Sequence, residues 1–293
     1  MGNKRAIQGG AAAAVTACLL TAFGVNAATV LPENLVDAAP FNWSTGADNT
    51  YLTADDYTNQ WGQIDLRNGG TAAITADYPH IGNGSLRLAA NGSDTAKAGV
   101  AYYPDSRNGF GPLSSITAAS FQYLRNAATA EPAPVMRLYL FTPGTDTHVA
   151  TLLWLSDANG VANQAADASW QTADVAAGSV VQNRAAGPLP NRPMTFAAAK
   201  ASSELGGLIV RAVEVGFGSS GWTGGFVSGV DNVILTGAAA SVSANFEARA
   251  VAGAPGAPGA PMATVPTLGE MGWAVTGLLL AGAAAGGLRR CRL

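Results

Sequence analysis

The chain has 293 residues, of which 12% are charged and 36 are glycine, a length that fits one β domain of up to about 250 residues plus appendages. Sixteen basic residues against 19 acidic ones exclude a protein that binds nucleic acid through a strong positive charge. Two cysteines and two histidines exclude a disulfide-rich scaffold and a zinc site built mainly from those residues.

The N-terminus has the pattern of a secretory signal peptide, residues 1–27. Positive charges at Lys4 and Arg5 precede a run of small, apolar residues, and the small residues that close it predict cleavage after Ala27. A lipoprotein signal with Cys18 as the lipidated residue is the alternative, although the apolar run continues well beyond Cys18. We expect signal peptidase to release the rest of the chain outside the cytoplasm.

The body that follows is acidic and contains no cysteine. Residues 28–262 keep 11 of the 16 basic residues and 18 of the 19 acidic ones, which gives a net charge of −7. The charged residues outside this range are Lys4, Arg5, Glu270, Arg289, Arg290 and Arg292. The body must therefore fold without disulfides, and its charge disfavours direct binding to nucleic acid or anionic lipid.

The pattern of the body, residues 28–248, is that of β-structure. Strands are predicted at 85–88, 121–123, 135–142, 150–155, 208–217 and, as the final strand, 230–235. Leu86 and Leu88 share one face with Arg87 on the other; in the same way Met136, Leu138 and Leu140 oppose Arg137 and Tyr139, and Phe121 and Tyr123 share a face. One short helix is expected near 195–205. Many strands and one minor helix predict an all-β fold, an antiparallel jelly-roll-like β-sandwich.

The residues that could carry catalysis form no recognisable set. His80 and His148 are expected in exposed loops, with no spacing that suggests a triad. Asp55, Asp56 and Asp65 lie near Trp61, a mixture that a polysaccharide hydrolase would use but that also occurs in a solvated acidic loop. We expect a protein that is not an enzyme, with hydrolysis of extracellular polysaccharide as the third hypothesis.

Two kinds of binding stay open. Asp231 in the last predicted strand is a candidate ligand for a structural calcium ion, or simply a polar position on a strand face; no other cofactor is expected. Trp61 and Trp222 have glycine and polar neighbours, so they are candidates for exposed indoles that stack on a sugar ring. The alternative function is therefore a carbohydrate-binding module.

Two stretches of the body add a loose resemblance. Residues 68–88 and 215–235 resemble the opening and closing strands of bacterial extracellular β-sandwiches. Such domains are similar in outline to carbohydrate-binding and laminin-G-like jelly rolls. The resemblance implies the fold better than the ligand.

The C-terminus contains a second predicted membrane-targeting segment. A Pro/Gly-rich linker, 249–264, leads to an uncharged apolar run, Met271–Leu288, which as a helix spans roughly 27 Å and matches a bilayer core. Arg289, Arg290 and Arg292 follow at once and predict a stop-transfer signal with the C-terminus inside.

The segment 265–293 resembles the IPTL-CTERM sorting domain: a short motif, a membrane helix and an arginine cluster in that order. The matching motif residues are Val265, Pro266, Thr267, Leu268, Glu270 and Gly272. The resemblance implies that the chain is a substrate of an exosortase, a membrane-embedded transpeptidase of Gram-negative bacteria. The precursor would sit in the inner membrane, and the product on the cell surface or in the extracellular matrix. The principal hypothesis is thus an exported, non-enzymatic structural or adhesive protein, with polysaccharide as an optional partner.

Overall fold

The computed structural model describes residues 27–37, 59–92, 95–104, 107–184, 192–218 and 224–249. Its elements, in chain order, are β1 (Ala28–Val30), η1 (Pro32–Asn34), β2 (Leu35–Asp37), β3 (Gln60–Arg67), β4 (Thr71–Thr75), β5 (Ser85–Ala90), β6 (Lys97–Tyr103), η2 (Leu113–Ser115), β7 (Ala118–Glu131), β8 (Val135–Phe141), β9 (His148–Trp154), η3 (Asp157–Asn159), β10 (Gln164–Ala166), β11 (Gln171–Asp174), β12 (Ser179–Arg184), β13 (Arg192–Thr195), α1 (Phe196–Ala201), β14 (Ile209–Gly218), β15 (Phe226–Thr236) and β16 (Ser241–Phe246).

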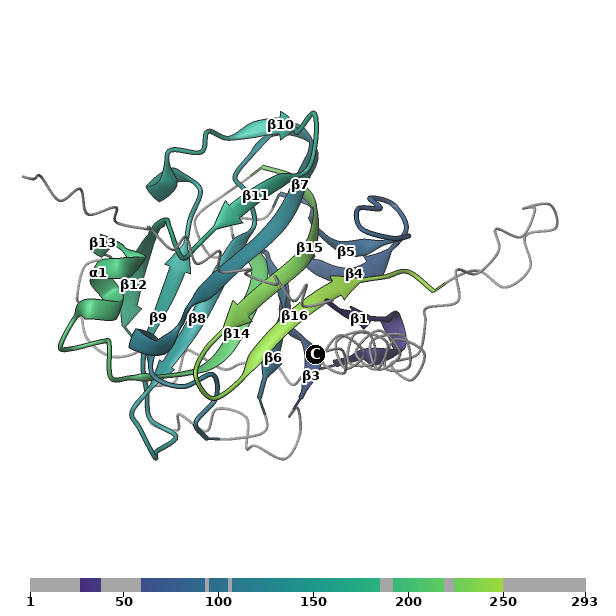
Figure 1. Cartoon of the computed structure of the whole chain (residues 1–293). Helices are drawn as coiled ribbons and strands as arrows, with labels where there is room; N and C mark the ends of the chain where they lie inside the picture. The colour runs from purple at the N-terminus through teal and green to yellow at the C-terminus, as the bar shows by residue number, and fades with distance from the viewer. Residues whose placement is uncertain are drawn as a thin grey trace, which may run out of the picture. The chain divides into compact units, whose positions relative to one another are not determined.

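The strands form two sheets of eight (Figure 1). In the first sheet, β15 pairs with β7 on one side and with β5 and β16 on the other; β4 and β1 extend that side, and β10 and β11 pair with β7. The second sheet has the order β13-β12-β9-β8-β14-β6-β3-β2. All pairings are antiparallel except β1 with β16 and β2 with β3. The prediction of an all-β, largely antiparallel fold of two sheets is confirmed.

Alternating side chains build the core between the two sheets. Leu86 and Leu88 of β5 are fully buried in it, whereas Arg87 points to the other face. Met136, Leu138 and Leu140 of β8 and Phe121 and Tyr123 of β7 are placed as predicted. Aromatic pairs join the sheets directly, because Phe217 of β14 stacks on Phe226 of β15 with ring centroids 4.3 Å apart. Period-two patterning therefore determines which faces meet.

Some expectations about the elements are wrong. The strand that contains Val230–Leu235 is not the last one, because β16 follows it and pairs with it. The helix is shorter than predicted: Thr195 caps its first turn by accepting the backbone N–H of Ala198 at 3.1 Å, and it ends at Ala201. His148 is not in an exposed loop but in β9, 4% exposed, with its ring 5.3 Å from that of Phe141.

Several predicted features lie outside the described residues. They are the signal peptide up to residue 26, including Cys18, the carboxylates Asp55 and Asp56, Trp222, the linker from residue 250, the sorting motif, the predicted membrane helix 271–288 and the final arginines. The compact unit that contains the β-sandwich ends at Arg249. Within the part of the chain that the structure describes, no helix is long and apolar enough to span a bilayer.

Candidate functional site

Two loops meet over the outer face of the first sheet and bring aromatic and amide side chains together. The loop between β4 and β5 supplies Tyr78 and His80, and the segment between β10 and β11 supplies Trp170. Gln122 of β7 and Asn232 of β15 complete the group. We call these five residues the aromatic platform; all five side chains are half-buried, so each keeps some surface open to solvent.

The centre of the platform is a stacked ring pair. The indole of Trp170 and the imidazole of His80 have centroids 4.3 Å apart and planes inclined by 18°. Gly229 of β15 leaves space for the Trp170 ring of this pair and for Tyr78. A Cβ at Gly229 would lie 3.1 Å from Trp170 Cη2 and 3.1 Å from Tyr78 Cβ. A side chain at this strand position would crowd both Trp170 and Tyr78.

A row of hydrogen-bonding groups runs beside the rings. Gln122 Oε1 accepts from His80 Nε2 at 2.6 Å and from Asn232 Nδ2 at 3.1 Å, which requires the His80 tautomer that carries its proton on Nε2. The hydroxyl of Tyr78 accepts from Asn126 Nδ2 at 3.2 Å. Flat apolar rings therefore stand next to amide, imidazole and hydroxyl groups that can both donate and accept.

An irregularity in β15 aims Asn232 at this row. Asn232 has a left-handed backbone, φ 48°, and the register of β15 with β7 shifts between Asp231 and Ile234. Such a bulge redirects side chains next to a functional surface. The neighbouring Asp231 is fully buried. Its carboxylate holds the loop between β4 and β5 in place, because it accepts the backbone N–H of Ile81 at 3.4 Å and that of Phe246 in β16 at 2.9 Å.

The contacts of Asp231 bear on the calcium hypothesis. Its oxygens are directed to backbone N–H groups, and burial raises the pKa of this carboxyl above its ordinary value. Within the described ranges, no group of three or more His, Cys, Asp or Glu side chains is placed to hold a metal ion. Asp231 therefore acts in this structure as a link between the β4–β5 loop and β16.

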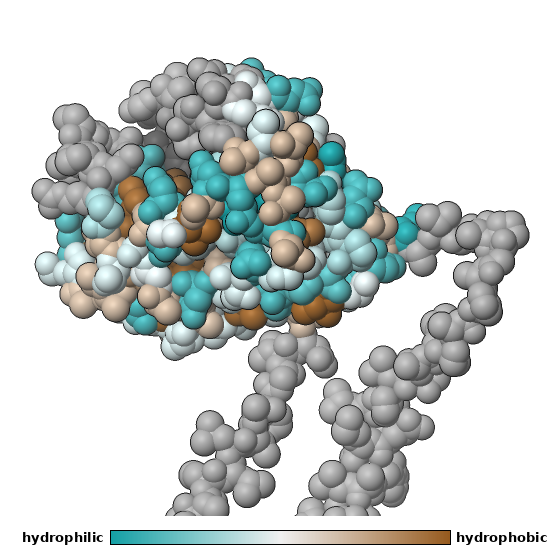
Figure 2. Space-filling view, turned by 90° about the horizontal axis from the view of Figure 1, so that it is seen from above, coloured by the Kyte–Doolittle hydropathy of each residue, from teal (hydrophilic) through white to brown (hydrophobic). Residues whose placement is uncertain are grey.

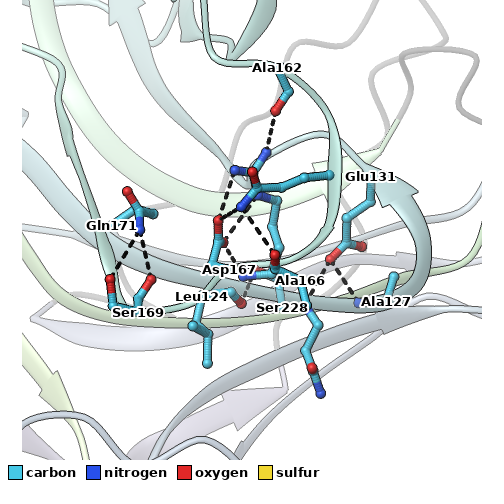
Figure 3. Close-up of polar contacts among 12 residues, drawn as sticks. Leu124, Ala127, Glu131, Ala162, Ala166, Asp167, Ser169, Gln171 and Ser228 are labelled. Carbon is cyan, nitrogen blue, oxygen red and sulfur yellow. Dashed lines mark hydrogen bonds and ion pairs between the residues drawn. The ribbon is translucent and has the colours of Figure 1, made fainter.

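A buried ion pair fixes the segment that carries Trp170 (Figure 3). Asp167 accepts from Arg125 Nε at 3.1 Å and from Nη2 at 2.9 Å, while Arg125 Nη1 donates to the carbonyl of Ala162 at 2.7 Å. Asp167 also accepts the backbone N–H of Arg125 at 2.6 Å. The side chains of Arg125 and Asp167 are 3% and 0% exposed, so this bidentate pair clamps the residues on both sides of β10 onto β7.

A second buried carboxylate closes the far end of β7. Glu131 accepts the backbone N–H of Ala127 at 3.3 Å (Figure 3) and that of Asn126 at 3.2 Å. It also accepts the backbone N–H of Val227 at 2.7 Å. Burial raises its pKa to about 7 despite these three donors. Glu131 thus ties the end of β7 to the beginning of β15, the two strands beneath the platform.

One face of the molecule is mainly polar (Figure 2). Figure 2 shows one face on which hydrophilic residues predominate and hydrophobic ones form small separate patches. Among the described residues only Leu66 and Ile81 are large, apolar and exposed, at 42% and 51%. Ile81 follows His80 directly in the loop between β4 and β5.

The tryptophan expected to be exposed is buried. Trp61 is 5% exposed and lies in the core, with ring centroids 5.5 Å from Tyr102 and 5.2 Å from Phe246. It is therefore not available to a ligand in this structure, and Trp222 lies outside the described residues. Asp65 does not belong to a solvated loop with Trp61, because it is buried in β3 and forms an ion pair with Lys97.

Trp170 is a site residue that the sequence analysis did not predict, although its neighbours carried a signal. Its neighbours Ser169 and Gln171 are both polar, whereas Trp61 and Trp222 each have one polar neighbour and one glycine. His80 is in a loop, as predicted, but it is half-buried against Trp170 rather than freely exposed. The two residues are distant in the chain, so only the fold brings them together.

Comparison with known proteins gives distant likenesses only. No family model matches the chain, and no curated protein matches it. A family 11 carbohydrate-binding module from a cellulosomal cellulase of Clostridium thermocellum is 15% identical, with 64% of this chain and 93% of that module covered and a TM-score of 0.36. A family 11 module from Clostridium thermocellum in complex with a β-1,3-1,4-mixed-linked tetrasaccharide is 12% identical, with 64% of this chain and 94% of that module covered and a TM-score of 0.33. An arabinose-bound GH51 α-L-arabinofuranosidase is 10% identical over 60% of this chain and 23% of its own, with a TM-score of 0.29. At these values the likenesses identify no ligand for this chain.

Proposed function

We propose that the β-sandwich is a non-enzymatic, jelly-roll-type carbohydrate-binding module that uses the aromatic platform. The observation that carries the proposal is the half-exposed Trp170–His80 stack beside the hydrogen-bonding row of Gln122 and Asn232. A pyranose ring has an apolar face of C–H groups and a rim of hydroxyls. An aromatic ring suits the first and amide or imidazole groups suit the second.

The charge of the body narrows the ligand class. Residues 28–262 have a net charge of −7, which repels uronic acid and sulfated polymers. Inside the platform, the groups that face the ligand are neutral amides, a hydroxyl and an imidazole. We therefore propose neutral polysaccharides, built from uncharged hexoses or pentoses, as the ligands.

Export and surface attachment form the second part of the proposal. It is supported by the signal-like residues 1–27 and by the tail, in which a motif, an apolar run and arginines follow one another. A polysaccharide-binding domain released outside the inner membrane by an exosortase would hold the cell surface and its matrix together, which joins the adhesive and the binding hypotheses. Fractionation with an epitope in the body tests this part; finding the body only in the cytosol would reject it.

Retention by polysaccharides tests the binding proposal. The full-length chain, purified in detergent, is run in native gels that contain a β-glucan, a xylan, a mannan or, as the acidic comparison, alginate. At least one neutral polymer should retard the unmodified chain, and Trp170→Ala should weaken that binding by at least about tenfold, ~1.4 kcal/mol. The matched control is Leu66→Ala, which removes an exposed apolar side chain from the second sheet and should change nothing.

Two results would count against the proposal. If no polymer retards the unmodified chain, the domain is not a carbohydrate-binding module of this type. If a polymer binds and Trp170→Ala retains full affinity, then the module binds elsewhere and the aromatic platform is not its site.

A further inference from the structure

The outer face of the second sheet carries a buried group of charged side chains that the proposed function does not use. Lys97 of β6 and Asp65 of β3 form an ion pair, with side chains 6% and 3% exposed. On the neighbouring strand β14, Glu214 is fully buried and accepts hydrogen bonds from Arg137 and from the hydroxyl of Tyr139. Burying this many charges is costly unless each has a partner, so their arrangement is specific.

The sheet brings the three reactive groups onto one face. Lys97 pairs with Gly218 and Gly99 pairs with Gly216, so β6 and β14 run side by side here. A Cβ at Gly99 would lie 2.8 Å from Glu214 Oε1, and one at Gly216 would lie 3.1 Å from it. The Glu214 carboxylate therefore lies over Gly99 of β6. Gly99 is two residues from Lys97 and is on the same face of the strand. Glu214 and Lys97 interact electrostatically.

A bulge places the third group. Asp65 has a left-handed backbone with φ 58°, and the register of β3 with β6 shifts between Ile64 and Arg67. An extra residue in one strand re-aims a side chain. Here the Asp65 carboxylate meets the Lys97 ammonium group directly. A buried lysine, a carboxylate in contact with it and a second carboxylate close by form the set of groups that amide formation requires.

We propose that Lys97 and Asp65 are joined by an intramolecular isopeptide bond, with Glu214 as the proton carrier for its formation. The bond would staple β3 to β6. The exported residues 28–262 contain no cysteine, so this would be a covalent cross-link in a domain that has no disulfide.

The reaction balances without any further reactant. The ammonium of Lys97 first passes one proton to the carboxylate of Asp65, which gives a neutral amine and a neutral acid, the pair that a water-poor site favours. The Lys97 nitrogen then forms a bond with Cγ of Asp65. The second proton on that nitrogen moves to Glu214, which delivers it to the departing oxygen as the Cγ–O bond breaks. One amide forms, one water leaves, and Glu214 returns to its original state.

The surroundings favour this chemistry in three ways. Burial lowers the pKa of Lys97, so its nitrogen is more readily neutral and nucleophilic than that of an exposed lysine. The low exposure of both partners excludes water, which would otherwise favour hydrolysis over condensation. Finally, the fold holds amine and carboxyl in contact, which replaces a bimolecular encounter by an intramolecular one.

Peptide mass mapping tests the proposal on the full-length chain isolated from the cells that export it. Trypsin should fail to cut after Lys97, and the peptide 88–107 should appear joined to the peptide that ends at Arg67. The joined product should weigh the sum of the two peptides minus one water molecule. Separate peptides of unmodified mass would overturn the proposal, and so would a water loss that maps to any other pair of residues.

Three variants separate the bond from a merely structural ion pair. Lys97→Arg keeps the charge but should abolish the joined product. Asp65→Asn should form the same amide by losing ammonia, so its joined product should have a mass identical to that of the unmodified chain, which no non-covalent role explains. Glu214→Gln should leave the two peptides separate. If the two peptides are fully joined in the Glu214→Gln chain, Glu214 is not the proton carrier. If that variant fails to fold, the mass of the joined product in Asp65→Asn still decides whether the bond forms.

Discussion

Replacing Asp167 with alanine tests whether the buried clamp holds the segment of Trp170. The change removes the acceptor of two guanidinium bonds and of the Arg125 backbone N–H, and leaves a guanidinium that is 3% exposed without its counter-ion. Removing one partner of a buried ion pair costs about 3–5 kcal/mol. In a domain of this size, that corresponds to a decrease in Tm of roughly 6–20 °C.

The assay is equilibrium unfolding in guanidinium chloride followed by circular dichroism, together with thermal melting at the same pH. Asp167→Asn keeps the shape and an acceptor, so we expect it to lose about 1–3 kcal/mol only. The double change Arg125→Met with Asp167→Leu removes both charges and should recover much of the loss. If Asp167→Ala lies within about 1 kcal/mol of the unmodified chain, the pair does not act as a clamp, and the reasoning on how Trp170 is positioned fails.

The other predictions concern the platform and two buried titrating groups. Gly229→Val should push the Trp170 ring off β15 and weaken polysaccharide retention in native gels, with little change in Tm; unchanged retention would show that the ring does not depend on Gly229. Burial raises the pKa of Glu131 to about 7 from 4.5, so its contribution to stability is complete at acidic pH and is lost as the pH rises through that window, by up to about 3 kcal/mol. Burial lowers the pKa of His148 from 6.5 to about 4, so its contribution is complete above pH 6.5 and is lost as the pH falls toward 4. The two groups therefore have opposite effects on the pH dependence of the unfolding free energy. In Glu131→Gln only His148 is left of the two, so the unfolding free energy should rise between pH 4 and 6.5; in His148→Gln only Glu131 is left, so it should fall between pH 4.5 and 7. Parallel curves in the two variants would contradict both assignments.

The strands that patterning predicts well are those with one apolar face. In β5 and β8 every second residue is apolar, so the inward side was evident from the sequence alone. The other face of such a strand is expected to be exposed to solvent, and in the second sheet it is not. Arg137 and Tyr139 alternate with the core residues of β8 as expected, yet they are 5% and 1% exposed. The same burial accounts for His148, whose polar sequence neighbours suggested a loop.

The candidate site could not be found from local sequence because its residues are distant in the chain. Trp61 and Trp170 each follow a polar residue, but remote partners decide their burial. Trp61 is covered by Phe246 from the other sheet, whereas Trp170 meets His80 over a strand position that carries no side chain. These contacts depend on the order of strands in the sheets, which a single sequence does not specify.

Hydrogen–deuterium exchange on the full-length chain, with and without a saturating neutral oligosaccharide, tests the central claim most directly. If the aromatic platform binds sugar, exchange should slow in peptides that cover residues 76–84 and 168–172, and stay unchanged in those that cover β6 and β9 of the second sheet. Protection confined to the second sheet, or no protection when binding is demonstrated at the same concentrations, would contradict the account.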